Sequence, residues 1–222
     1  MNVANPQILT CPFCGEKKEI MSLMSGNTFG AKMWSDNKCI YPMYPEISLV
    51  QKCPHCGKFY IRTRQQAIWA ESGHSFEQGL LTYEEMKQAF AQLMEAGDLT
   101  HDEEANVRMM LHHAHNDNFR REQTSEFTDD DLTLFRENAM WLIQNIITDN
   151  VMKAEFYREI GDFEKAKSIL DEVHASDPFY ITLVNKIQDK IANRDSAVFQ
   201  LYWYRRPSPC PFFLGEIAVT PC

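Results

Sequence analysis

Two pairs of cysteines carry the clearest chemistry in this sequence. Each pair follows the pattern C-P-x-C-G, with Cys11 and Cys14 in the first pair and Cys53 and Cys56 in the second. The short spacing lets both sulfurs of a pair reach one ion, and the glycine allows a left-handed turn that brings backbone amides toward the sulfurs. We therefore expect one structural Zn²⁺ ion held by all four thiolates.

The alternative is that these are ordinary buried cysteines or a redox pair, but the repetition of the pattern favours zinc. Four thiolates leave no open coordination position, so a catalytic role for the ion is not expected. The 38 residues between the pairs fit an inserted loop or hairpin. Cys39 in this insert and His55 inside the second pair are spare candidate ligands, and we expect neither to contact the metal.

The segment 112–117, HHAHND, is the one place where an enzyme could be hidden. On a helix, His113 and Asp117 lie one turn apart and could share a metal, while His112 and His115 form a neighbouring pair. We expect the segment to be the solvated flank of an amphipathic helix. Contacts with the cysteine-bearing region are one alternative, and a second metal or catalytic site is the other.

Bulk properties set limits on the function. The chain has 222 residues, 44% of them hydrophobic, enough for one small and one medium-sized domain. We find no apolar window of about 18 residues and no signal-peptide pattern at the start. We therefore expect a cytoplasmic protein without membrane contact, in which seven cysteines favour metal binding over disulfides. No G-x-S-x-G, Walker, GxGxxG or HExxH motif is present, so we do not expect an enzyme.

The formal charge of −9 is unevenly distributed. Residues 1–66 contain eight Lys and Arg against four Asp and Glu, a charge of +4, and the remainder contains 14 against 27, a charge of −13. The basic head supports an alternative function as a nucleic-acid-associated regulator. Its basic residues would be Lys17, Lys18, Lys32, Lys52, Lys58, Arg62 and Arg64, with Phe13, Trp34, Phe59 or Tyr60 for stacking on bases.

The chain divides into three parts by its local patterns. Residues 1–66 lack sustained helical periodicity and are predicted to form a zinc-ribbon domain, with a strand at 58–64. Residues 67–200 are predicted to form an α-helical domain. The tail at 201–222 combines prolines with a short apolar run, and we do not place it.

Several helix boundaries are marked by capping residues. Thr82 with Glu85 and Thr100 with Glu103 fit the capping-box pattern, and the sequence from Thr128 to Asp131 is a weaker version. The first helix should end at Gly97. Further helices are predicted at 129–149, 150–160 and 163–175, and after Asp177 and Pro178, which suit the N-cap and first helical positions.

The cysteine pairs resemble those of zinc-ribbon and rubredoxin-like domains. Members of this group bind nucleic acid, proteins or only their own metal. The resemblance therefore implies a fold and a metal but no activity.

Residues 147–180 resemble a tetratricopeptide repeat. Val173 replaces the usual small residue, and Lys153 stands at a usually large apolar position. One repeat cannot bury its own face, so we expect the helices at 129–149 and 179–193 to flank it as degenerate repeats or caps. The positions that carry the resemblance are Ala154, Tyr157, Gly161, Phe163, Ala166, Leu170, Val173 and Pro178.

The sequence as a whole predicts a mainly α protein with a small N-terminal β and loop zinc ribbon, followed by tetratricopeptide-like antiparallel helix pairs. This order of domains resembles uncharacterised bacterial families. The favoured function is a non-enzymatic zinc-binding protein whose helices present a surface to an unknown protein or peptide partner. The alternatives are the nucleic-acid-associated regulator and a metal-dependent hydrolase built on residues 112–117.

Overall fold

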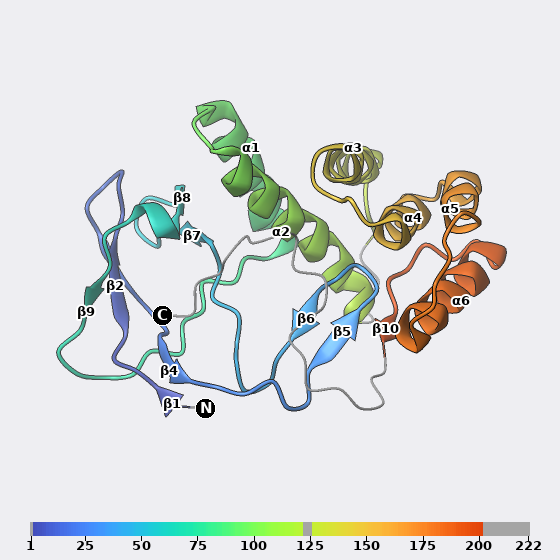
Figure 1. Ribbon diagram of the computed structural model, residues 1–222. Helices are drawn as coiled ribbons and strands as arrows, with labels where there is room; N and C mark the ends of the chain where they lie inside the picture. The colour runs from blue at the N-terminus through green and yellow to red at the C-terminus, as the bar shows by residue number, and fades with distance from the viewer. Residues whose placement is uncertain (1, 122–125, 202–222) are drawn as a thin grey trace.

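The computed structural model describes residues 2–121 and 126–201, and the 202–222 part of the predicted tail lies outside these ranges (Figure 1). The N-terminal part consists of loops and short strands, and α-helices follow, in agreement with the predicted mainly α class. The strands are β1 (Asn2–Val3), β2 (Gln7–Thr10), β3 (Lys17–Ile20), β4 (Leu23–Ser25), β5 (Lys32–Trp34), β6 (Cys39–Ile40), β7 (Val50–Lys52), β8 (Phe59–Ile61), β9 (Ile68–Trp69) and β10 (Gln200–Leu201). The helices are α1 (Tyr83–Ala96), α2 (His101–Arg120), α3 (Asp129–Asn145), α4 (Asn150–Glu159), α5 (Phe163–Leu170) and α6 (Pro178–Ala192).

The strands form small antiparallel sheets rather than one continuous sheet. β2 pairs with β3 and β9, β7 pairs with β8, and β1 pairs with β4. A strand predicted over 58–64 is too long, because β8 ends at Ile61 and residues 62–64 form a 3₁₀ turn. β7 begins at Val50, which pairs with Ile61, so the paired strands end there, although the N–H of Arg62 still donates to the carbonyl of Leu49 over 2.8 Å.

The helix starts follow the predicted capping residues. At Thr82, Thr100 and Thr128 the threonine side chain accepts a hydrogen bond from the backbone N–H three residues later, and the acidic residue there returns one. Asp131 completes the third box although it is shorter than the usual glutamate. α1 ends at Gly97, which takes the left-handed conformation with φ of 66°.

Helix α5 is shorter than the predicted 163–175, because it ends at Leu170. Asp171 and Glu172 follow at its C-terminal end. Negative charges at that end oppose the helix dipole and disfavour a further turn. The predicted N-cap Asp177 and the proline at the first position of α6 are confirmed.

Three apolar clusters join the helices to one another and to the strands. α1 and α2 pack with β7 and β8, and α3 packs with α4. The third cluster lies between α4, α5 and α6 and includes Met33 from β5 and Leu201 from β10. No helix in the described ranges combines the length and the apolar character that crossing a bilayer requires.

The insert between the cysteine pairs therefore reaches the helical body. β5 lies between β6 and β10 in a three-stranded sheet, with Met33 opposite both Cys39 and Leu201. In Figure 1 this sheet lies beside α6, separate from the other strands of the N-terminal part. Residues 32–40 are thus tied to the end of the helical segment.

Candidate metal centre

Each cysteine pair lies on a tight turn with the same backbone hydrogen bonds. In the first turn the N–H of Cys11 donates to the carbonyl of Glu16 over 2.8 Å, and the N–H of Gly15 donates to the carbonyl of Cys11 over 3.0 Å. The second turn, from Cys53 to Gly57, repeats both bonds. The two glycines have φ of 77° and 73°, a left-handed conformation that glycine adopts without strain.

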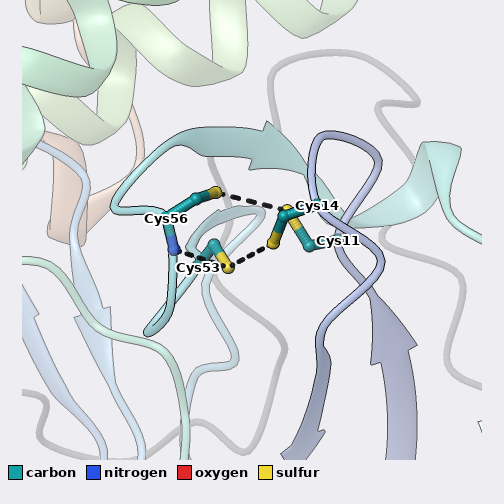
Figure 2. A group of neighbouring side chains, drawn as sticks. All are labelled: Cys11, Cys14, Cys53 and Cys56. Carbon is teal, nitrogen blue, oxygen red and sulfur yellow. Dashed lines mark hydrogen bonds between the residues drawn. The ribbon is translucent and has the colours of Figure 1, made fainter.

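The two turns bring all four predicted cysteines together (Figure 2). Their sulfur atoms lie within 4.8 Å of one another, with 3.7 Å between Cys11 and Cys56 and 3.6 Å between Cys14 and Cys53. Four sulfurs at about 2.3 Å from one ion in a tetrahedron are about 3.8 Å apart. The donor set thus fits a tetrahedral metal with little movement.

The site has a buried side and a solvent side. Cys11 and Cys53 are 2% and 1% exposed and pack with Leu9, Ile20 and Tyr60 in a small apolar cluster. Cys14 and Cys56 are exposed. A metal held here would complete the core of this region from its open side.

The four thiols perturb one another's pKa values. Burial raises the pKa of Cys53, but hydrogen bonds from the amides of Cys56 and His55 outweigh it and lower the pKa to about 6. For Cys14, a bond from the Glu16 amide lowers the pKa, whereas burial and the neighbouring thiols raise it to about 12. Because the four thiols lie close together, the first thiolate to form disfavours ionisation of the other three. A bound cation would stabilise all of the thiolates.

The two spare candidate ligands lie outside this group. Cys39 is on β6, where it packs against the cluster of α4, α5 and α6. His55 is exposed at the tip of the second turn. Among the described residues, the four cysteines are the only set of His, Cys, Asp or Glu side chains whose donor atoms meet as a metal site requires.

The histidine segment on α2 is not the solvated flank that we expected. His112 is 0% exposed and His115 is 3% exposed. His112 stacks between Phe135 and Phe156, with ring centroids 4.8 and 4.3 Å away. The interpretation was wrong because α3 and α4 cover the polar face of α2, which local periodicity does not reveal.

Contacts with the N-terminal part, which were one alternative, are present instead. The turn after β5 inserts Asp36, 0% exposed, against α2. Asn116 donates to the Asp36 carboxylate over 3.0 Å, and Arg120 forms an ion pair with it. His113 bonds to the Asp36 carbonyl oxygen over 3.2 Å. A further ion pair of 2.9 Å joins Lys38 to Asp117.

The buried charges that complete this network were not predicted. Glu159 on α4 bonds to His112 over 2.7 Å and to Asn116 over 2.9 Å. One turn earlier, Glu155 pairs with Arg158, and both side chains are 0% exposed. Arg158 also donates to the carbonyl of Ala197 over 3.1 Å. The spacing of three between Glu155 and Arg158 was visible in the sequence, but the layers that bury them were not.

Acidification from pH 7 to pH 5 is expected to destabilise the fold through His115. Burial lowers its pKa to about 4 from the ordinary 6.5. Below pH 6.5 the unfolded chain therefore binds a proton that the folded chain does not, and stability falls until the pH reaches the folded pKa. At pH 5 this costs about 2 kcal/mol. Urea unfolding at the two pH values measures the loss.

His112 adds little to this acid sensitivity because Glu159 opposes it. Burial lowers the pKa of His112 to about 4 and raises that of Glu159 well above its ordinary value. Together they hold about one proton in either state around pH 5. Burial also lowers the pKa of His113 to about 4, so His113 contributes in the same direction as His115. The variant His115→Gln is the control, since it should reduce the slope of stability against pH without removing it. An unchanged slope in this variant would contradict the assignment.

No protein-family model, no curated protein and no solved structure matches the chain, so similarity to known proteins adds nothing to the geometry described above.

Proposed function

We propose that this is a non-enzymatic zinc-binding protein with one structural Zn²⁺ ion and a helical body that serves as a protein-interaction surface. The observation that carries the proposal is the meeting of four cysteine sulfurs within 4.8 Å of one another. The set is complete with thiolates alone, so a bound ion keeps no open position for a substrate. Free thiols of this kind suit a reducing compartment, and we place the protein in the cytoplasm.

The donor set narrows the choice of metal. Tetrahedral sites of four thiolates are typical of zinc and of iron, whereas calcium and magnesium prefer oxygen ligands. Zinc is redox-inert, which suits a site whose buried side is part of an apolar core. These considerations favour zinc, and the experiment below distinguishes it from iron.

The hydrolase alternative loses support from the surroundings of residues 112–117. His112 and His115 are buried between aromatic rings. His113 and Asp117 bond to the turn after β5 and to Lys38. In the described part of the chain these side chains form no group of three metal donors.

The nucleic-acid alternative also loses five of its eleven candidate residues. Phe59 and Tyr60 are 4% and 3% exposed, so neither can stack on a base. Ion pairs neutralise three of the basic side chains: Lys18 lies 3.8 Å from Glu77, Lys52 lies 2.9 Å from Glu85, and Arg64 lies 2.6 Å from Glu103. Phe13 remains exposed, beneath the ammonium group of Lys58.

Support for the interaction role comes from the helical segment. α4 packs against α5, and α5 packs against α6, in the stretch that resembles a tetratricopeptide repeat. Such stacked helices present side chains on a broad surface. Large apolar side chains are exposed on these and the neighbouring helix: Ile181 on α6 is 42% exposed, and Leu132 on α3 is 49% exposed.

Metal content tests the proposal directly. Protein purified without added metal should contain one zinc per chain by elemental analysis. Cobalt should replace it at one equivalent, with the visible spectrum of a tetrahedral thiolate site. The variant Cys53→Ser should lose the metal, and the control Cys39→Ser should keep it. Iron in place of zinc, no metal, or a second metal that survives in Cys53→Ser would overturn the proposal.

A further inference from the structure

Glu159 on α4 is a fully buried acid that forms no ion pair with a lysine or arginine of the described ranges. Its Oε2 atom lies 2.7 Å from Nε2 of His112, and both side chains are 0% exposed. No donor in the described part of the chain reaches its other oxygen, Oε1. An ionised carboxylate in this place would keep most of its desolvation penalty. Glu159 and His112 together therefore need one proton to be neutral.

A second buried carboxylate stands next to Glu159. The Nδ2 atom of Asn116 donates to Oδ2 of Asp36 over 3.0 Å and to Oε2 of Glu159 over 2.9 Å. Two carboxylates that share one amide nitrogen in the interior of a protein cannot both carry a charge at low cost. Because Asp36 forms an ion pair with Arg120, Asp36 is the ionised member and Glu159 is the neutral one.

Glu155 adds another negative charge one turn earlier on α4. It forms its own ion pair with Arg158, and both side chains are 0% exposed. Burial, Glu155 and Asp36 raise the pKa of Glu159 well above its ordinary value, and Arg158 offsets only part of this. Burial lowers the pKa of His112 to about 4. The shared proton therefore belongs to the carboxyl group and not to the imidazole.

The other charges around Glu159 balance one another. Ion pairs link Asp36, Arg120, Asp117 and Lys38 into a set without net charge. On α3, Arg136 is exposed and donates to the carbonyl of Ile160 over 3.0 Å. The titratable and charged side chains near Glu159 and His112 are His113, Asp117 and Arg120 on α2, Glu155 and Arg158 on α4, Arg136 on α3, and Asp36 and Lys38 after β5.

Ionisation of Glu159 would act on the turn after β5. Its charge would repel that of Asp36 across the amide of Asn116, and Asp36 is the residue that anchors this turn to α2. The helices α2 and α4 are fixed by apolar clusters. The turn is bound to α2 by polar contacts, so it should move first.

We propose that Glu159 keeps a proton in the folded protein and donates it in a hydrogen bond to His112, and that this proton keeps the turn after β5 bound to α2. Loss of the proton at alkaline pH releases the turn. The assignment is independent of the metal and of the function proposed above, because it involves none of the four cysteines and no exposed surface of the helices.

The stability of the fold should therefore fall as the pH rises. Above pH 6.5 the unfolded chain has lost the protons of both side chains, whose ordinary pKa values are about 4.3 and 6.5. The folded chain keeps one of them until the pH passes the raised pKa of Glu159. Between these limits the folding equilibrium constant falls by up to about tenfold for each pH unit.

Infrared spectroscopy of the full-length protein tests where the proton lies. Wild-type protein at pH 7 should show the carbonyl band of a protonated carboxylic acid, and the band should shift when the glutamate side chains carry carbon-13. Glu159→Gln should lose the band. Glu155→Gln is the matched control, since it removes a buried but ionised acid and should keep the band. No band in the wild type, or a band that the glutamate label does not shift, would overturn the proposal even if neither variant folded.

A comparison of the wild type with Glu159→Gln at equal pH tests the release of the turn. The glutamine amide can still donate to His112 and accept from Asn116, and the titration of all other groups cancels. Urea unfolding should show the wild type losing stability relative to the variant from pH 7 to pH 9, by up to about tenfold in the equilibrium constant per pH unit. Segments 33–40 and 112–120 should exchange hydrogen faster in the wild type at pH 9 and equally at pH 6. Parallel stability profiles, or equal exchange of 33–40 at pH 9, would overturn the proposal.

Discussion

Replacement of Cys53 by serine is expected to unfold the region around the two cysteine pairs while α4, α5 and α6 stay folded. The apparent free energy of binding of a structural zinc is about 10–16 kcal/mol. The apolar cluster around Cys53 has few members, among them Leu9, Ile20 and Tyr60. So small a core cannot replace that contribution. Removal of the metal from the native chain with a chelator should have the same effect.

Hydrogen exchange followed by mass spectrometry measures this result segment by segment. Protection should be lost in 7–20 and 50–61. It should weaken in α1, because Phe59 and Ile61 of β8 share a cluster with Met86 of α1. It should persist in α5 and α6. The variant Cys39→Ser is the control, and unchanged protection of 7–20 in Cys53→Ser would show that the thiolate site does not hold this region together.

Replacement of Asp36 by alanine is expected to destabilise the whole fold by about 3–5 kcal/mol. The substitution removes the fully buried partner of the Arg120 guanidinium, which is 3% exposed, and leaves it only the ion pair with Asp117, a side chain 23% exposed. It also removes one of the two carboxylate acceptors of the Asn116 amide, the other being Glu159. The loss is large because the partly exposed Asp117 offsets only part of the desolvation penalty of the buried Arg120 charge.

Urea unfolding of the variants of a double-mutant cycle separates the interaction energy of Asp36 and Arg120 from the contributions of the residues around them. Arg120→Met alone should also be destabilising, but the double variant with Asp36→Ala should be less destabilised than the sum of the two. The ion pair of Lys167 and Asp171 is the surface control, with both side chains more than half exposed. Asp171→Ala should cost less than about 1 kcal/mol. Equal losses in Asp36→Ala and Asp171→Ala would contradict the prediction.

Local chemistry made the ends of the helices and the cysteine group predictable. A threonine followed three residues later by an acid satisfies backbone groups within a single turn, so Thr82, Thr100 and Thr128 could be read without any tertiary information. The two C-P-x-C-G turns are equally local. Only the proximity of the two turns depends on the tertiary structure. Binding of one shared ion is a reason to expect that proximity.

The surroundings of the histidines could not be predicted in the same way. Periodicity identifies the face of α2 that packs on α1, but His112 and His115 lie on a face that is buried by α3 and α4. Asp36 comes from a turn more than 70 positions earlier in the chain. A polar residue buried by a third layer looks like a solvated residue when only its neighbours along the helix are considered.

The pairing of β5 with β10 joins segments that lie far apart in the sequence, with Ser35 and Phe199 separated by 164 positions. During synthesis all four cysteines emerge once Cys56 is made, whereas Gln200 follows 144 residues later (200 minus 56). At about 5–20 residues per second, this interval is on the order of 10 to 30 s. Throughout it, Met33 has no β10 beside it and the cluster around α6 is incomplete. A nascent chain can therefore bind its metal early, but the insert stays exposed to chaperones and to other chains until β10 has been made.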